Sequence, residues 1–270
     1  MASIEGAILD FKRLDLLASG DTGLHRLDPR AKVLVTALFV VLVISHDRYE
    51  ISALVPFIIF PAALIAAGNL PAGYIAGKIL LLCPVVIVVG IFNPLFDRAI
   101  MLQLGPVGIS GGWLSFVSIV FRSLLTVGSA FVLLALTGFP GLCRALEQLG
   151  MPRTFAVQLL FLYRYIFVLT EEAGRAVRAR QLRSCGTKGQ GMGSFATLVG
   201  HLLLRTWQRA ERVHVAMLSR GFDGRFHTSR ETSFGSRELL FVIGWGGVLI
   251  LLRSINLSHL VGTVVMGGLP

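Results

Sequence analysis

Long apolar runs without charge are the feature of this sequence that most restricts its fold. Residues 51–68 carry no charge, and residues 78–95 carry only Lys78 at their start. A helix of about 20 apolar residues crosses the hydrocarbon core of a bilayer, where every backbone polar group must be satisfied internally. The composition agrees, because 54% hydrophobic and only 15% charged residues are untypical of a soluble domain. We therefore expect an all-α, polytopic integral membrane protein.

Five segments are long and apolar enough to be predicted as transmembrane helices. They are residues 31–46, 51–68, 78–95, 113–139 and 239–252. Pro56 and Pro61 predict a bend in the second span. Arg122 is the charge within the fourth span, and two interpretations stay open: it bonds a backbone carbonyl or snorkels, or it contacts a partner subunit. A Gly- and Pro-containing stretch at 96–112 predicts an external loop.

The charge distribution predicts the orientation of the chain. Residues 171–230 hold eleven Lys or Arg against four Asp or Glu, which is typical of a cytoplasmic region. Four spans precede this region, so the N-terminus is expected in the cytoplasm as well. The net charge of +10 is then explained by membrane topology, and no nucleic-acid partner is expected. Three parts follow: 1–139 with the N-terminal segment and spans one to four, 140–237 in the cytoplasm, and 238–270 with the last span and the tail.

Patterns of catalytic and metal-binding residues are lacking in the sequence. The predicted spans contain no Asp or Glu, which disfavours a stand-alone secondary transporter. The histidines are scattered, and the least improbable metal cluster is His46 with Asp47 and Glu50. The glycines at 186–193 are not closed by Gly-Lys-Ser/Thr, so they predict a turn, and any nucleotide is hydrolysed by another chain. We expect no catalytic residue, no metal site and no cofactor in this chain.

Two long helices are predicted in the cytoplasmic part, at 153–183 and about 195–220, after a short amphipathic helix at 140–152. Each long helix carries an arginine near its end, directly after a small residue: Ala179-Arg180 in the first and Ser219-Arg220 in the second. A small neighbour lets a partner approach the guanidinium, and Gly221 suits a left-handed helix end. Contact with lipid phosphates is the alternative interpretation.

Several motifs resemble one family of transport proteins. They are Leu24–Lys32 (LHRLDPRAK), Tyr163-Arg164-Tyr165, Glu171-Glu172 and Ala216–Phe222 (AMLSRGF). With these motifs the sequence resembles the transmembrane T component of energy-coupling factor (ECF) transporters, particularly the cobalt or nickel type, often called CbiQ or NikQ.

The resemblance implies two cytoplasmic coupling helices, each ending in a motif of small residue, Arg and usually Gly. In that family the two arginines dock into grooves of two ATP-binding-cassette (ABC) ATPase subunits. Ser219-Arg220-Gly221 matches the second motif. Ala179-Arg180-Gln181 matches the first only in part, because Gln181 stands where Gly is usual, and Arg183 is therefore a rival for the first docking arginine.

The resemblance also implies the function. The chain would be the non-catalytic scaffold of a bacterial or archaeal cell-membrane importer for cobalt or nickel ions. It would transmit motion from ATPase subunits, which hold ATP and Mg, to a membrane substrate-binding (S) subunit. A T component of a vitamin-type ECF transporter is the nearest alternative.

Overall fold

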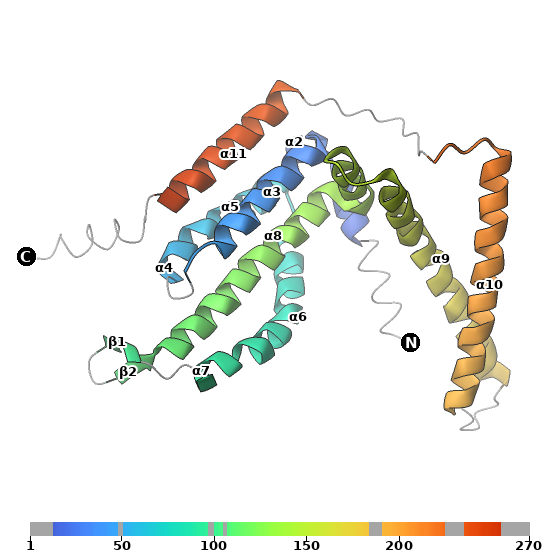
Figure 1. The fold of residues 1–270 in the computed structure, drawn as a ribbon, viewed down its shortest axis with the longest axis horizontal. Helices are drawn as coiled ribbons and strands as arrows, with labels where there is room; N and C mark the ends of the chain where they lie inside the picture. The colour runs from blue at the N-terminus through green and yellow to red at the C-terminus, as the bar shows by residue number, and fades with distance from the viewer. Residues whose placement is uncertain are drawn as a thin grey trace, which may run out of the picture. The chain divides into compact units, whose positions relative to one another are not determined.

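The computed structural model describes residues 13–47, 51–96, 100–104, 107–183, 191–224 and 235–254. Within these ranges the chain is helical apart from one small β-hairpin, which confirms the all-α class (Figure 1). Most of the predicted turn at 186–193 lies outside these ranges. The residues Glu50, Cys185, His227 and His259 and the tail after residue 254 also lie outside them. Two compact units are present: a bundle unit (14–145 and 232–270) and an arm unit (1–13 and 146–231).

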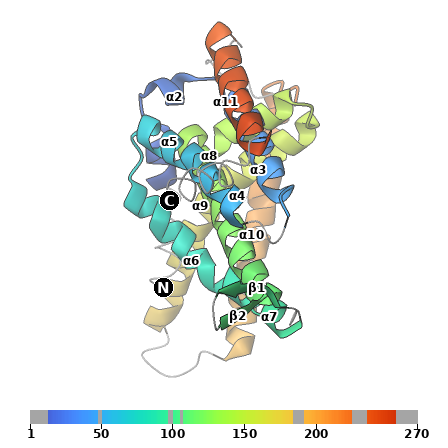
Figure 2. The ribbon, with the colours of Figure 1, turned by 90° about the vertical axis from the view of Figure 1, so that its left-hand side faces the viewer.

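The bundle unit contains most of the predicted spans. Its helices are α2 (Gly23–Arg26), α3 (Pro29–Ile44), α4 (Ile51–Leu54), the 3₁₀ helix η1 (Val55–Ile58), α5 (Ile59–Gly68), α6 (Ala72–Gly90), α7 (Phe92–Phe96), α8 (Gly111–Gln148) and α11 (Ser236–Ser254), shown in Figure 2. The predicted bend in the second span is present, because the chain passes from α4 through η1, which contains Pro56, into α5. The last three residues of α8 belong to the arm unit.

Four helical segments in the described ranges are long and apolar enough to cross a membrane. They are Ile51–Gly68, Ala72–Pro94, Gly111–Gln148 and Arg153–Arg183. The first three contain or overlap predicted spans two to four, so the chain is a multi-pass membrane protein. The other two predicted spans form helices, but α3 has only 16 residues and α11 carries Arg237, Glu238 and Arg253. Their passage through the membrane stays a prediction.

Aromatic side chains form the centre of the bundle unit. Phe39 of α3 stacks on Phe60 of α5 with ring centroids 4.6 Å apart, and Trp245 of α11 meets Phe60 edge-on at 5.1 Å. Phe39, Phe57 and Phe60 are almost fully buried. Offset and edge-on ring pairs add to apolar packing. These ring contacts therefore help to hold α3, α5 and α11 together.

Two arginines hold the C-terminal end of α3. Arg122 of α8 donates hydrogen bonds to the carbonyls of Ile44, His46 and Asp47 at 3.2, 3.0 and 3.2 Å. Arg253 of α11 donates to the carbonyl of Ser45 at 3.0 Å. The last carbonyls of a helix lack intrahelical donors and carry partial negative charge, so they favour cations. The carbonyl contact predicted for Arg122 is therefore present.

One detail differs from the sequence predictions. Strands β1 (Ile100–Leu104) and β2 (Val107–Ser110) pair antiparallel within the stretch predicted as a loop, where Gly105 and Pro106 stand between them in sequence. The predicted boundary near Pro140 is present, because Gly138 in α8 has a non-helical backbone with φ of +68° and ψ of 159°. The predicted fourth span and the short amphipathic helix are therefore two helical parts of α8 that meet at this kink, and the second part ends at Gln148.

Candidate docking surfaces on the arm unit

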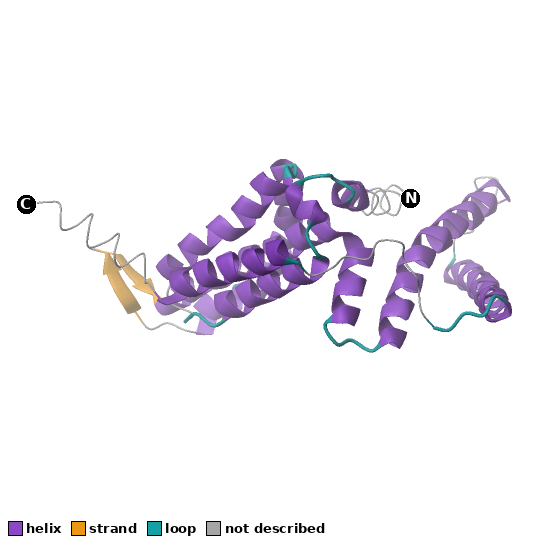
Figure 3. Ribbon diagram, turned by 90° about the horizontal axis from the view of Figure 1, so that it is seen from above, coloured by secondary structure: helices purple, strands orange, loops and turns teal. Residues whose placement is uncertain are grey.

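The arm unit consists chiefly of two long helices that run antiparallel. They are α9 (Arg153–Arg183) and α10 (Met192–Ser219), and Figure 3 shows both helices from above. The α9 bounds match the prediction, because Pro152 precedes the helix and a Gly-containing segment follows it. Of their described side chains only Ala156 is buried, so the pair has almost no apolar core of its own.

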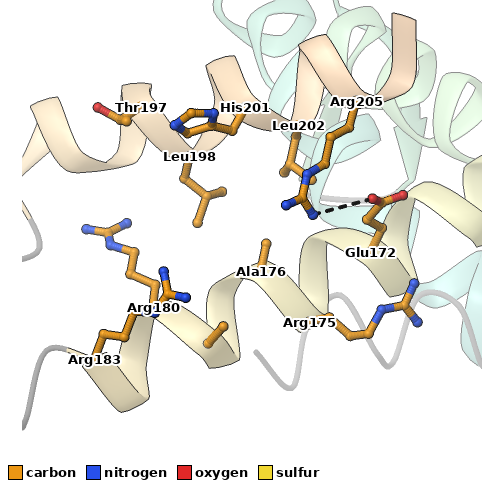
Figure 4. A pocket seen from close by; sticks show the side chains of 11 residues that line it. Glu172, Arg175, Ala176, Arg180, Arg183, Thr197, Leu198, His201, Leu202 and Arg205 are labelled. Atoms are coloured by element: carbon orange, nitrogen blue, oxygen red, sulfur yellow. Dashed lines mark ion pairs between the residues drawn. The ribbon is translucent and has the colours of Figure 1, made fainter. Parts of the chain in front are cut away.

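One carboxylate joins the two helices. The side chain of Glu172 on α9 is only 12% exposed and lies 3.2 Å from Nη2 of Arg209 on α10. Nη1 of Arg205, also on α10, lies 3.8 Å from the carboxylate, and a dashed line marks this ion pair in Figure 4. Charge-assisted hydrogen bonds of this kind are stronger than neutral ones. In the sequence, Glu172 stands out only as part of the Glu171-Glu172 motif. Its position as an acid within a strongly basic segment could have indicated a salt bridge.

A basic cleft of about 790 Å³ lies between α9 and α10. Its lining combines four arginines and a histidine with small and apolar residues: Glu172, Arg175, Ala176, Ala179, Arg180, Arg183, Thr197, Leu198, His201, Leu202 and Arg205. Figure 4 shows the guanidinium groups of Arg180 and Arg183 on the α10 side of α9. The cleft is therefore suited to an anionic or carbonyl-rich partner surface.

The first predicted motif lies in the last turn of α9, beside this cleft. Ala179 and Arg180 line the cleft and Gln181 does not. Arg180 is half-buried, whereas Gln181 and Arg183 are exposed. Both arginines stand where the helix dipole favours a cation. The structure thus brings both rival docking residues, Arg180 and Arg183, to the same end of the cleft.

The second predicted motif forms the end of α10. The amide of Gly221 donates to the carbonyl of Leu218, and the amide of Phe222 donates to that of Met217, both at 3.0 Å. With φ of +71° at Gly221 these bonds make a Schellman motif, which confirms the predicted left-handed helix end. Ser219, Arg220 and Gly221 are exposed, and nothing lies within 4 Å of a Cβ placed on Gly221. A partner surface can therefore approach Arg220 closely.

The two motifs lie at opposite ends of the helix pair. Arg180 lines the cleft together with Leu198, and Arg220 follows 22 residues further along α10. At about 1.5 Å per residue this places the two motifs roughly 33 Å apart. The antiparallel course of α9 and α10 therefore creates two separate surfaces, one with the half-buried Arg180 and one with the exposed Arg220.

Comparison with known proteins identifies the family. The sequence profile of the family described as cobalt transport protein, CbiQ, matches residues 20–232. The chain belongs to this family. The match confirms the resemblance found in the sequence, and it covers the N-terminal motif, the predicted spans two to four and both helices of the arm unit.

Three relatives show how far the likeness extends. The ECF transporter transmembrane protein EcfT of Thermosediminibacter oceani is 26% identical over 229 residues, which cover 78% of this CbiQ-family chain and 84% of that protein. EcfT of Streptococcus thermophilus is 24% identical over 260 residues, covering 87% and 96%. A protein of Methanocorpusculum labreanum named as a fused cobalt transport protein, CbiMQ, is 35% identical over 104 residues, but these cover 38% of this chain and only 17% of that protein.

Metal-ligating side chains do not converge in the part of the CbiQ-family chain that the structure describes. No three His, Cys, Asp or Glu residues there lie close enough to hold an ion. His46, which the sequence grouped with Asp47 and Glu50, is buried and its Nδ1 bonds the carbonyl of Leu42 at 2.8 Å. His46 lies just after the end of α3 and its ring bonds back to a carbonyl in the last turn of that helix.

Proposed function

We propose that this chain is the T component of an ECF-type importer, and that ABC-type ATPase subunits act on its arm unit. One observation carries the proposal. An antiparallel helix pair presents an arginine motif at each of two separate ends, in a chain related over most of its length to proteins named as ECF transporter transmembrane proteins. Two separated motifs suit two ATPase subunits, one at each end.

The arrangement suggests how ATP-driven motion enters the chain. Arg180 or Arg183 binds one ATPase subunit and Arg220 binds the other, while ATP and Mg remain on those subunits. When the two ATPases approach each other, both ends of the helix pair move, and the crossing of α9 and α10 changes. The first half of α9 is apolar enough to lie in the membrane, so this motion reaches a membrane substrate-binding (S) subunit. The chain itself performs no chemistry.

We propose cobalt or nickel ions as the substrate, bound by the S subunit. The family description and the fused relative's name both refer to cobalt transport. The relatives that align over most of the chain are named EcfT without a substrate, so a vitamin-type transporter is the second candidate. Identification of the S subunit that copurifies with the chain, followed by uptake of radioactive Co²⁺ against labelled vitamins, distinguishes the two.

The basic residues support a cytoplasmic position for the arm unit and the N-terminus. Eleven Lys or Arg against four acids at 171–230 are expected on the cytoplasmic side, where the ATPases are. A labelling test with membrane-impermeant maleimide on single cysteines at Arg13 and Arg212 measures this orientation. Labelling of both from outside intact cells would contradict it.

The decisive experiment is affinity purification from mild detergent with and without Arg220→Glu. We expect ABC ATPases to copurify with the wild-type chain and to be lost with the variant, while membrane insertion stays normal. Loss of a charged contact at a docked interface reduces affinity by about 2 to 5 kcal/mol. Arg212→Glu, on the same helix, is the matched control and should keep the ATPases. Normal association of Arg220→Glu would remove the docking role, and Co²⁺ flux through the chain alone in liposomes would favour a secondary transporter.

A further inference from the structure

The N-terminal motif Asp28-Pro29-Arg30-Ala31-Lys32 has no place in the docking surfaces, yet two of its charged side chains are buried. Lys32 is 4% exposed and Asp28 is 1% exposed. Asp28 caps the start of α3, where one oxygen accepts the amide of Arg30 at 2.9 Å. Burying a charge costs free energy unless it is paired and hydrogen-bonded, so the partner of Lys32 indicates its role.

Lys32 bonds the carbonyl of the residue four positions before Pro140 in α8. Its Nζ donates to the carbonyl of Leu136 at 3.0 Å. In an unbroken helix this carbonyl would accept the amide of residue 140, but residue 140 is proline and has no N–H. Lys32 therefore replaces the missing backbone donor at the kink, across 104 residues of sequence.

The backbone around this bond is specific to the kink. Gly138 has φ of +68°, and a Cβ on it would lie 3.2 Å from Cβ of Ala18. A Cβ on Gly141 would lie 3.0 Å from Cγ2 of Thr137 and 3.8 Å from Cγ of Pro29. The start of α3 and residue 18 thus pack directly against the bend, so Lys32 and Pro29 contact it from the same motif.

The kink divides α8 into two parts. The part before it lies in the bundle unit, as does the part after it as far as residue 145, and from there the chain continues through Pro152 into α9. We propose that Lys32 is a positioning residue for energy coupling: it fixes the bend at Leu136–Pro140 and with it the direction in which the chain leaves the bundle toward the coupling helices. This inference rests on the proposed function of the arm unit.

The first test measures the bend in the full chain alone, reconstituted in liposomes. Spin labels are placed at Val117, which is 46% exposed, and at Arg144, which is half-buried and lies beyond the kink in the same unit, after replacement of the native cysteines by alanine. We expect one narrow distance distribution for the wild type and for Lys32→Arg. Lys32→Met should broaden it or shift it to longer distances, because the carbonyl of Leu136 loses its donor. An unchanged distribution in Lys32→Met overturns the proposal.

The second test measures coupling in the complex with the copurifying ATPase and S subunits. Co²⁺ uptake per ATP hydrolysed should fall at least tenfold in Lys32→Met and stay normal in Lys32→Arg. Lys78→Met, at a lysine over the Tyr74 ring, is the matched control and should behave as wild type. Normal coupling in Lys32→Met overturns the positioning role, even if the bend changes.

Two further arms keep the tests decisive. If Lys32→Met does not insert, Lys32→Leu replaces it, because its side chain likewise has no donor; a normal bend and normal coupling in Lys32→Leu overturn the proposal. If the wild-type chain binds no ATPase, the proposed function fails. In that case the spin-label distances still decide whether Lys32 fixes the bend.

Discussion

Replacing Glu172 by Gln should loosen the crossing of α9 and α10. The carboxylate is 12% exposed and bonds Arg209 at 3.2 Å, with Arg205 at 3.8 Å, so the substitution keeps the shape and removes the charge. Hydrogen bonds to charged groups contribute about 1.5 to 3 kcal/mol, whereas exposed ion pairs contribute below about 1 kcal/mol. Both arginines are more than a third exposed, Arg205 at 67% and Arg209 at 41%. We therefore expect the substitution to weaken the association of the two helices by about 1 to 2 kcal/mol.

This loss is measurable because the helix pair has almost no buried apolar side chain to replace it. A loss of about 1 to 2 kcal/mol changes the equilibrium between crossed and separated helices roughly 5- to 30-fold. The assay is the rate at which a short bismaleimide joins cysteines at Ala176 and Leu202, which line the cleft from opposite helices. The rate should fall in Glu172→Gln and recover in the charge exchange Glu172→Arg with Arg209→Glu.

Glu171 supplies the matched control for this experiment. Its side chain is 60% exposed and lies 4.0 Å from Arg175 on the same helix, so Glu171→Gln should change the cross-linking rate by less than twofold. A double-mutant cycle of Glu172→Gln with Arg209→Gln gives the pair energy directly. Equal rates for Glu171→Gln and Glu172→Gln, or a pair energy below about 0.3 kcal/mol, would refute the role of Glu172.

Three further predictions concern single residues. Gly221→Ala should weaken ATPase copurification, because φ of +71° costs alanine about 1 kcal/mol or more, whereas Gly200→Ala within α10 should have no such effect. Arg122→Met should lower the free energy of unfolding of the bundle unit by about 2 to 4 kcal/mol, because three carbonyls lose their donor. A melting temperature equal to that of the wild type would contradict this prediction. Burial lowers the pKa of His25, whose ring nitrogens contact Leu17 O and Thr22 Oγ1. The unfolded chain then binds the proton more tightly, so stability is full above about pH 6.5 and falls as the pH drops below it; this loss should disappear in thermal melts of His25→Gln.

The helices of this chain were largely predictable from local sequence. Pro152 precedes α9 and a Gly-containing segment follows it, so the predicted bounds match those observed, and Gly221 indicated the end of α10. Periodicity and helix-end residues act over a few positions, and a single sequence displays them directly. The two docking motifs were therefore found, whereas their roles stay predictions.

The contacts between distant segments were not predictable in the same way. Lys32 looked like a charge at the end of a span, and only the tertiary structure shows that it bonds a carbonyl 104 residues away. Pro140 indicated a helix boundary, and the helical backbone is interrupted at Gly138, two residues earlier. The bond that Lys32 makes at this kink could not be predicted, because no local pattern connects this side chain to α8.

The two helices of the arm unit are only weakly held together, and each end of the pair carries an arginine motif. Of the arm unit's described helical side chains only Ala156 is buried, so charged contacts such as that of Glu172, and whatever binds the two arginine motifs, contribute strongly to the crossing. A pair held by about 1 to 2 kcal/mol of charged contacts can be reoriented by docked partners, since charged contacts at an interface are worth about 2 to 5 kcal/mol when broken. Strengthening the pair, for example by a disulfide across the cleft, should therefore block uptake while ATPase binding persists. Uptake that continues with the helices locked would show that energy reaches the bundle by another route.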